Sequence, residues 1–402
     1  MDTRNLASDR PLTGVTVLDF GQIYNGPYCG HLLAMAGARV IKVESPIGET
    51  LRNSTASSGE GYPFRALNGN KETITLNFKR PDGQRLLKEM VRHVDVLLEN
   101  YRPGTMAKYG IGSEELMAIN PRLIYASGTG YGQNGPHADY LAMDVTVQAM
   151  SGVVSVTGYE GDPPLKSGPA ICDMLGGVHL YGAITSALYR RERTGLGAVL
   201  DIAMQDAVIP TLCSAIGAYY RTGGNPPRTG NHHQARAIAP YNIYETRDGH
   251  VAIICIREGH WRKLVAAMES PDLLHDELFA NMEARSKNMD RTDAVVLDWT
   301  ASRSTQEVFE LCQLFGVPCS PVQTLSDVLS DRHLLARGML KEVTDKSNRS
   351  MMLFGTPIQF EGVRPPDPTL PREIGQDNEA VYGELLGLRR ESVDDYRRSG
   401  VL

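Results

Sequence analysis

The chain has 402 residues, which at about 150 residues per domain predicts two or three domains and a core that needs no disulfide or metal to fold. Hydrophobic residues make up 42% and charged residues 22%, which excludes a mostly disordered, collagen-like or coiled-coil protein. The formal net charge of −6 argues against general binding to nucleic acid or to an acidic membrane, although it leaves room for a local basic pocket.

The six cysteines form no C-x-x-C pair and show no ligand spacing with histidine. We therefore expect neither a metal site nor a disulfide framework, and we expect a reducing cytoplasm. The N-terminus has no apolar signal core, and no run reaches about 18 apolar residues, so we expect no signal sequence and no membrane span.

The first 130 residues alternate between buried strands and helices. Strands are predicted at 14–20, 39–44, 73–76, 94–98 and 123–127, and helices at about 28–36 and 81–92. Strand and helix in repetition predict an α/β fold with a parallel sheet and right-handed crossovers.

The later chain predicts a smaller second domain after a linker. A long helix is expected from Asp173 to about Arg193, then a strand at 198–203, a helix at 204–221 and a linker rich in Gly, Pro and Asn at 222–240. Beyond the linker we expect a strand at 251–256 and helices at 259–268 and 305–316, and the proline-rich segment 360–375 is expected to be extended.

Ligands of parallel sheets bind outside the carboxyl ends of the strands. In this chain those ends are the segments 20–27, 44–52, 98–104 and 127–136, which read equally well as ordinary turns. Residues 130–135 match G-x-G-x-x-G, but no obvious helix follows and no strand ends in an acidic residue about 20 positions on. The context therefore argues against a dinucleotide site.

Asp173 follows a loop and an apolar pair and stands at the start of the long predicted helix. One interpretation is an N-cap that accepts hydrogen bonds from free backbone N–H groups. The other is a nucleophile, because the positive helix end would keep the carboxylate ionised and nearby N–H groups would stabilise an oxyanion.

Basic residues near the strand ends form a second set of candidates. Lys79, Arg80, Arg102 and Lys108 would together hold phosphates, although each one alone reads as solvated surface charge. His232, His233 and Arg236 lie in the linker, where they would be able to face the site.

Several motifs in a fixed order carry a family resemblance. They are Leu18-Asp19-Phe20 through Gly26-Pro27, Gly37 to Glu44, Asn70-Lys71, Asp95 to Gly104, Asn120 to Ile124, Gly130-Tyr131-Gly132 with Gly135-Pro136, Asp173 with Gly177, Thr194-Gly195, and Gly316 to Val322. In this order and spacing they resemble the class III CoA-transferases of the CaiB/BaiF or formyl-CoA transferase type. The resemblance covers nearly the whole chain and is weakest at about 222–300.

The resemblance implies an α/β fold with a Rossmann-like large domain and a smaller α/β domain. The large domain would comprise 1–222 and the returning segment 331–402, and 223–330 would form the small domain with its linker. Two chains would interlock as a homodimer. Asp173 would attack an acyl-CoA to form a mixed anhydride, the CoA thiolate would convert it into an aspartyl-CoA thioester, and a carboxylic acid acceptor would take the CoA.

Carried over position by position, the resemblance implies that coenzyme A contacts one set of residues: Gln22, Ile23, Tyr24, Ser45, Leu76, Lys79, Asn100, Tyr101, Arg102, Lys108, Leu141 to Asp144, with Met143 among them, and Met204. Four positions depart from the formyl-CoA transferase pattern. Gln22 stands in place of His, Ser45 in place of Arg, Leu141 in place of Lys and Met143 in place of Tyr, which argues against formate and oxalate as substrates.

Two alternatives stay open beside CoA transfer. The α-methylacyl-CoA racemases of the same family need a His base where this chain has Met143, and a non-catalytic CoA-binding protein would need no nucleophile. For CoA transfer we expect an acyl-CoA donor, such as that of a dicarboxylic acid. An acceptor-carboxylate site is expected at His232, His233, Arg236 and Tyr241.

Overall fold

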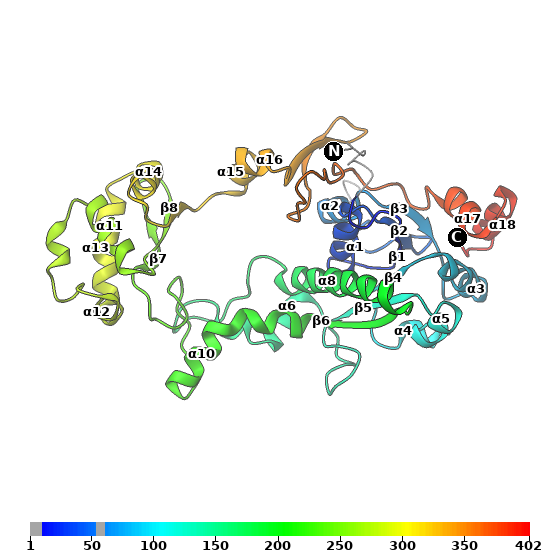
Figure 1. The fold of residues 1–402 in the computed structure, drawn as a ribbon, viewed down its shortest axis with the longest axis horizontal. Helices are drawn as coiled ribbons and strands as arrows, with labels where there is room; N and C mark the ends of the chain where they lie inside the picture. The colour runs from blue at the N-terminus through cyan, green and yellow to red at the C-terminus, as the bar shows by residue number, and fades with distance from the viewer. Residues whose placement is uncertain (1–9, 54–60) are drawn as a thin grey trace. The chain divides into compact units, whose positions relative to one another are not determined.

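The computed structural model describes residues 10–53 and 61–402 (Figure 1). The N-terminal segment, for which we expect no signal sequence, lies mostly outside these residues. The chain divides into two compact units: Met1–Ser151, Gly168–Pro210 and Asp331–Leu402 form the first, and Gly152–Ser167 and Thr211–Ser330 form the second. Compared with the boundaries expected from the sequence, residues 152–167 and 211–222 pack with the second unit. The division into a large and a small folding domain stays a prediction.

The first unit is built on a six-stranded sheet. Its strands are β1 (Thr16–Asp19), β2 (Arg39–Glu44), β3 (Glu72–Thr75), β4 (Val96–Glu99), β5 (Ile124–Thr129) and β6 (Ala198–Ala203). Their order is β3-β2-β1-β4-β5-β6, and every neighbouring pair is parallel. The expected α/β fold with a parallel sheet is therefore confirmed.

The strand order reverses between β1 and β4, so the loops that follow these two strands leave the sheet in opposite directions. In open parallel sheets of this order, a crevice forms at that point, outside the carboxyl ends of the strands. The fold therefore singles out the loops after Asp19 and Glu99 as the place for a site.

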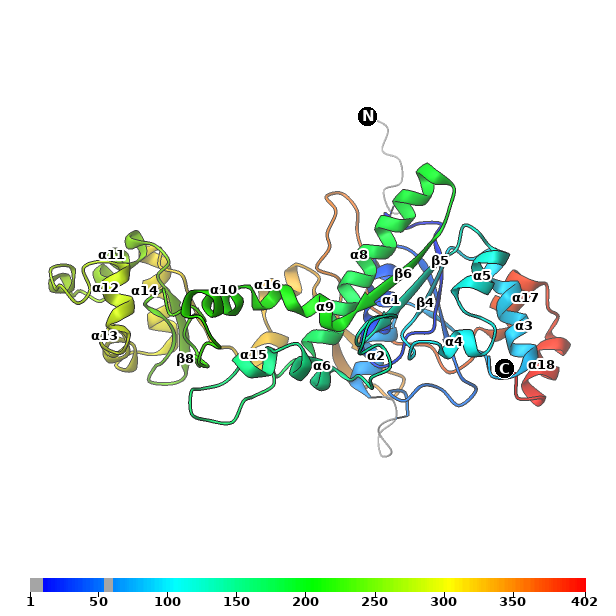
Figure 2. The same cartoon turned by 90° about the horizontal axis from the view of Figure 1, so that it is seen from below.

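Both faces of the sheet are covered, as the apolar strands require. Side chains alternate along each strand: Leu18 and Leu97 join one core, and Val17 and Leu98 join the other. Figures 1 and 2 show α3 (Pro81–Met90), α17 (Asn378–Leu386) and α18 (Arg390–Arg398) on one side, and α1 (Asn25–Met35) and α8 (Ile171–Thr194) on the other.

The C-terminal segment closes one edge of the sheet. Asp377 and Asn378 accept hydrogen bonds from the backbone N–H groups of Thr73 and Thr75 in β3, each at 2.8 Å, and the hydroxyl of Tyr382 donates to the carbonyl of Thr75. Side chains thus replace the missing neighbouring strand at this edge. At the opposite edge, β6 leaves Val199 55% exposed.

The long helix α8 starts two residues before the expected Asp173 and ends at Thr194, where Gly195 adopts a left-handed conformation with φ 72°. Among the described residues it is the one helix long and apolar enough, by length and composition alone, to cross a membrane. The core helix of a folded domain has the same length and composition, and α8 packs on α1, β5 and β6.

The helix expected at 204–221 is wrong as a single element. It divides into α9 (Met204–Val208), a 3-10 turn at Ile209–Leu212 and α10 (Cys213–Thr222). Pro210 lies in the turn, and its ring and missing N–H interrupt the α-helical hydrogen bonds.

The second unit has a three-stranded antiparallel sheet of β7 (Tyr241–Glu245), β8 (His250–Ile254) and β9 (Cys319–Pro321) in sequential order. Around it lie α11 (Glu258–Ala267), α12 (Met282–Lys287), α13 (Met289–Ala301) and α14 (Thr305–Phe315). The helices α11, α13 and α14 share a core that includes Trp261, and Arg285 of α12 lies over the ring of Trp261. The sequence predicts β8, α11 and α14 and misses the rest.

The remaining elements are short. They are α2 (Tyr62–Asn68), α4 (Thr105–Lys108), α5 (Ser113–Ile119), α6 (Asp144–Met150), α7 (Val153–Val156), α15 (Leu325–Leu329), α16 (Arg332–Ala336), the hairpin β10 (Leu340–Thr344) and β11 (Ser350–Phe354), and 3-10 turns at Val91–His93 and Pro271–Leu274. After β5, the chain forms no helix before α6, so the segment Gly130–Gly135 lacks the helix that a dinucleotide motif needs.

Candidate active site

A cavity of about 150 Å³ lies where the strand order reverses. Its lining comes from the ends of β1, β4 and β5, from the loop before α6, and from the starts of α8 and α9: Gln22, Ile23, Asn25, Asn100 to Pro103, Gly128 to Gly130, Ala138, Tyr140, Ala142, Met143, Asp173 and Met204. Three of the four loops singled out from the sequence therefore meet around one cavity, and Asp173 is the carboxylate within it.

Asp173 is the third residue of α8 and is 8% exposed. The interpretation of Asp173 as an N-cap is wrong, because Ala170 holds that position and another carboxylate binds the helix end. Oδ1 of Asp144 accepts hydrogen bonds from the backbone N–H groups of Cys172 and Asp173, at 2.8 and 3.2 Å. No group in residues 10–53 and 61–402 donates a hydrogen bond to the Asp173 carboxylate itself.

Burial, together with the nearby charge of Asp144, raises the pKa of Asp173 to about 7. This overturns the expectation that the helix end would keep the pKa below its ordinary value. The free N–H groups that would have stabilised the Asp173 charge are instead bound by Asp144, and two carboxylates close together oppose each other's ionisation. A strongly shifted carboxylate in a cleft is typical of a functional group.

The loop after β1 is fixed by a reciprocal pair of hydrogen bonds. The side chain of Asn100 accepts from the backbone N–H of Gln22 at 2.7 Å and donates to its carbonyl at 2.8 Å. Gln22 in turn donates from Nε2 to the hydroxyl of Tyr101 at 3.1 Å. The next residue, Ile23, has φ 65°, a conformation that β-branched residues rarely adopt and that tends to mark functional sites.

Two buried ion pairs also hold the loop that follows β1. Lys71 pairs with Asp19 at 2.8 Å and Lys42 with Glu49 at 2.9 Å, and all four side chains are nearly inaccessible to solvent. Lys42 also donates to the carbonyl of Gly21, and Lys71 to that of Pro27 at 3.0 Å. The charged cluster therefore anchors both ends of the loop that carries Gln22 and Ile23.

Most of the expected CoA contacts converge on this region. Gln22, Ile23, Asn100, Tyr101, Arg102, Met143 and Met204 line the cavity with Asp173. A smaller hollow of about 50 Å³ adjoins Gln22 and Tyr101 and is also lined by Ser45 and Leu76. These residues are gathered as the resemblance implies, and their binding of coenzyme A stays a prediction.

Other expected contacts line neither hollow. Tyr24 caps α1, Lys79 is exposed, Leu141 is 72% exposed, and Lys108 places Nζ 5.9 Å from the ring of Tyr109. Asp144 also lies outside the lining, because its carboxylate faces the backbone of α8.

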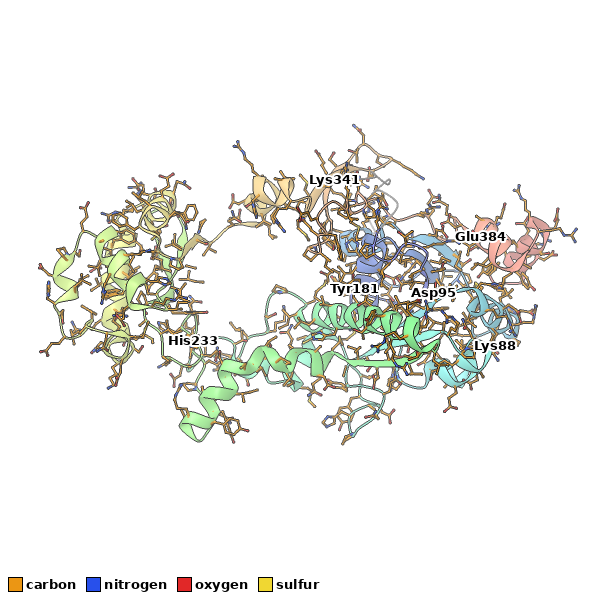
Figure 3. The ribbon with its side chains drawn as sticks, in the orientation of Figure 1. Lys88, Asp95, Tyr181, His233, Lys341 and Glu384 are labelled. Atoms are coloured by element: carbon orange, nitrogen blue, oxygen red, sulfur yellow. The ribbon has the colours of Figure 1, made fainter. Side chains whose placement is uncertain are left out.

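The expected acceptor residues lie in the second unit, where Figure 3 labels His233. His232 contacts the carboxylate of Asp293 at 2.6 Å, the ring of His233 lies 5.4 Å from that of Tyr241, and Arg236 forms an ion pair with Glu160 at 3.5 Å. His233 and Tyr241 are therefore neighbours, whereas His232 is bound within a polar cluster of its own. An acceptor site at these residues stays a prediction.

The sequence misses the role of one residue of the site and the importance of another. Asp144 is expected as a CoA contact but binds the backbone at the start of α8, and Asn25 is expected only as part of the turn Asn25-Gly26-Pro27. The signal for Asn25 is a polar side chain just after the first strand, at the point where ligands of such sheets bind. Its significance emerges only from its burial, which sequence pattern does not show.

No group of three His, Cys, Asp or Glu side chains suited to a metal occurs among residues 10–53 and 61–402.

Comparison with known proteins places the chain in a family. Residues 12–378 match the model of CoA-transferase family III. The chain is 36% identical over 395 residues to the succinyl-CoA–D-citramalate CoA-transferase of Chloroflexus aurantiacus, covering 96% of each protein. It is 35% identical over 359 residues to the acetyl-CoA:oxalate CoA-transferase of Acetobacter aceti, covering 89% of this chain and 90% of that protein.

The fold is also similar to solved structures. A CaiB/BaiF family protein from Brucella suis shares 34% sequence identity and a TM-score of 0.81, over 93% of this chain and 99% of the other. The resemblance inferred from the motifs is thus confirmed, and the chain belongs to CoA-transferase family III and is an enzyme that transfers coenzyme A.

Proposed function

We propose that this enzyme moves CoA from an acyl-CoA thioester to a carboxylic acid through covalent intermediates on Asp173. The observation that carries the proposal is the burial of the Asp173 carboxylate without a hydrogen-bond donor. It is a buried carboxylate in the cavity where the sheet reverses, and among the described residues it receives no hydrogen bond. A carboxylate that is poorly solvated and unpaired is available to attack an activated acyl carbon.

The first half-reaction uses the thioester as its source of energy. An oxygen of Asp173 attacks the thioester carbonyl, the C–S bond breaks, and the acyl group and Asp173 share a mixed anhydride while CoA leaves as a thiolate. The thiolate then attacks the aspartyl carbonyl of the anhydride. The donor acid leaves as a carboxylate, and an aspartyl-CoA thioester remains.

The second half-reaction reverses the sequence with the acceptor. The acceptor carboxylate attacks the carbonyl carbon of the aspartyl thioester, and the CoA thiolate leaves. The acceptor and Asp173 then share a new mixed anhydride. The thiolate then attacks the acceptor acyl carbon, and Asp173 leaves as a carboxylate. Each step exchanges one activated acyl group for another, so the cycle needs neither ATP nor a proton donor.

The neighbours of Asp173 support these steps. Asp144 holds the first turn of α8 and keeps the Asp173 carboxylate basic, while Gln22 and Asn100 fix the shape of the opposite wall. The small, partly buried cavity limits the entry of water, which would otherwise hydrolyse an anhydride.

We infer that the substrates are small organic acids. The relatives include transferases named for succinyl-CoA with D-citramalate and for acetyl-CoA with oxalate. Arg102 lines the cavity and would bind an anionic group, either a distal carboxylate of a dicarboxylic donor or a phosphate of CoA. A dicarboxylic acyl-CoA such as succinyl-CoA is therefore our first choice of donor.

Racemisation of an α-methylacyl-CoA is the weaker candidate. It needs a base close to Asp173, and the position at which the resemblance expects a histidine is occupied by Met143, which lines the cavity. A thioether cannot abstract a proton. A racemase would incorporate solvent deuterium into a 2-methylacyl-CoA without any acceptor acid, and we expect none.

Trapping of the intermediate tests the main proposal. The enzyme is incubated with succinyl-CoA and then with hydroxylamine, and its peptides are analysed by mass spectrometry. We expect a hydroxamate at Asp173, and we expect Asp173→Ala to lower the rate of transfer by about 10⁴-fold or more.

Asp206→Asn, which removes an exposed carboxylate outside the cavity, serves as the matched control and should retain both signals. A Asp173→Ala protein that is folded and still transfers CoA at the wild-type rate would exclude the covalent route.

We further propose that the enzyme acts as an interlocked homodimer in the cytoplasm. In the first unit, α8 and β6 expose Val178, Tyr189 and Val199, and in the second unit α10 exposes Tyr220 at 80%. Exposed apolar side chains on several elements indicate a protein interface. All six cysteines are free thiols, which fits the reducing compartment.

A further inference from the structure

The carboxamide of Asn25 is buried beside the catalytic cavity without a partner. Asn25 is the first residue of α1, is 2% exposed and contributes to the cavity lining with Asp173. Among the described residues, nothing forms a hydrogen bond with either Nδ2 or Oδ1. Buried polar atoms in folded proteins are almost always paired, because an unpaired one costs stability. An orphaned amide at a substrate cavity therefore indicates a group that a ligand satisfies.

A capping role does not explain this side chain. Tyr24 holds the N-cap position of α1, and no side-chain cap bond is formed there. The amide thus contributes nothing to the hydrogen bonding of its own helix.

Glycines on two neighbouring elements make room for the amide. A Cβ added to Gly128 in β5 would lie 2.7 Å from Oδ1 of Asn25, and one added to Gly176 in α8 would collide with Nδ2. Gly176 follows Asp173 by three residues and so lies on the same face of α8. The Asn25 amide is therefore about one helical turn away from the nucleophile.

Met204 lies beside the Asn25 amide in the cavity lining. Cγ of Met204 lies 3.1 Å from the position of a Cβ on Gly176, beside Nδ2 of Asn25, and both residues line the cavity. Met204 has an unbranched, flexible side chain that readily repacks. An acyl chain that enters the cavity would therefore find a neighbour of the amide that can move aside.

We propose that Asn25 recognises a hydroxyl group on the acyl chain, on carbon 2 or carbon 3, and so selects hydroxyacyl substrates. A carboxamide has both donors and an acceptor. A carbonyl or carboxylate oxygen would satisfy only Nδ2, whereas a hydroxyl accepts from Nδ2 and donates to Oδ1, which satisfies both orphaned atoms. The proposal rests on the proposed function, since it concerns the acyl group presented to Asp173.

The test compares 2-hydroxybutyryl-CoA and 3-hydroxybutyryl-CoA with butyryl-CoA, with succinate as acceptor. Sites built to bind a hydroxyl reject its absence by up to about 10⁴-fold or more, and we expect the wild type to prefer one of the hydroxyacyl donors by at least about 10-fold in kcat/KM.

Asn25→Leu keeps the branched shape and removes both polar atoms. It should lower kcat/KM for the preferred hydroxyacyl donor more than that for butyryl-CoA, so that the preference falls to near unity, and its Tm should equal or exceed that of the wild type. Asn134→Ala, which removes an exposed amide outside the cavity, should keep the preference. An unchanged preference in Asn25→Leu, or an equal loss for both donor types, overturns the proposal.

A binding measurement separates this proposal from the covalent mechanism. Calorimetry of the Asp173→Asn protein with the same three thioesters reports recognition without turnover. Tighter binding of a hydroxyacyl-CoA, abolished by adding Asn25→Leu, supports the proposal even if no adduct forms on Asp173. Equal affinities for the three thioesters overturn it, whatever the mechanism of transfer.

Discussion

The charge state of one carboxylate controls the proposed chemistry at the scale of single residues. Only the ionised form of Asp173 is a nucleophile, and burial with the neighbouring Asp144 raises its pKa to about 7. A raised pKa means that the proton leaves only as the pH approaches neutrality. Burial lowers the fraction of Asp173 that is ionised at a given pH. The carboxylate that does form is poorly solvated and is therefore a stronger nucleophile.

We expect the rate of transfer to depend on pH through this group. Below about pH 7, kcat/KM should fall about tenfold for each pH unit as Asp173 becomes protonated, and it should level off above pH 8. A profile measured from pH 5 to 9 with succinyl-CoA checks this. An acid limb centred near pH 4, the ordinary range of an aspartate, would contradict the buried and unpaired environment of Asp173.

Sequence pattern predicts the identity of several site residues better than their roles. Asp173, Gln22 and Asn100 are identified from motifs and lie around one cavity. The predicted direction of the Asp173 pKa shift is wrong, because the shift is set by the burial of the side chain and by the nearby Asp144, and sequence pattern shows neither. The orphaned amide of Asn25 is missed for a similar reason, since burial without a partner arises only from the packing of α1 against β5 and α8.

At the scale of elements, the N-terminus of α8 is held by a side chain from another helix. Asp144 is the first residue of α6, and its carboxylate accepts hydrogen bonds from the backbone N–H groups of Cys172 and Asp173. A helix end with unbound N–H groups favours a nearby anion, so this contact joins α6 to α8. The helix that carries Asp173 is thereby fixed in place by α6, whose Asp144 adds to the effect of burial on the pKa of Asp173.

Two substitutions at Asp144 separate these effects. Asp144→Ala removes the acceptor and should destabilise the protein by about 1 kcal/mol, which is typical of a lost helix cap. Asp144→Asn keeps an oxygen acceptor and removes the charge, so it should cost less stability while moving the acid limb of kcat/KM to lower pH. Urea unfolding and pH profiles of both variants measure the two effects. An unshifted acid limb in Asp144→Asn would show that burial alone sets the pKa of Asp173.

The elements of the sheet are largely predictable, and those of the second unit are not. All six strands of the sheet carry runs of apolar or β-branched residues, and β2 begins and ends where expected. By contrast, β7 is a half-exposed segment of five residues, Tyr-Asn-Ile-Tyr-Glu, and β9 has three residues, so neither shows a periodicity that separates it from a loop. Their pairing with β8 is a long-range contact that local pattern does not reveal.

At the scale of the whole molecule, the two edges of the six-stranded sheet differ in how they are covered. The β3 edge of the sheet is closed by Asp377, Asn378 and Tyr382, but β6 at the other edge has no such cover among the described residues. An uncovered edge strand with exposed apolar side chains is a liability in solution that proteins usually cover or pair. The contrast between the two edges locates the proposed interface on the side of α8 and β6.

We therefore expect the protein to have twice the 44.1 kDa mass of one chain in solution, as measured by light scattering or sedimentation. Val199→Lys and Tyr189→Glu place charges on the exposed face of β6 and α8, and they should weaken association at low protein concentration because a charge buried at an interface is left unpaired. Lys346→Glu is the matched control, since Lys346 is an exposed side chain distant in sequence from both elements, and it should leave the mass unchanged. A wild-type protein that stays monomeric at micromolar concentration would refute the dimer. A dimer that both charged variants leave intact would instead place the interface on a surface other than the face of α8 and β6.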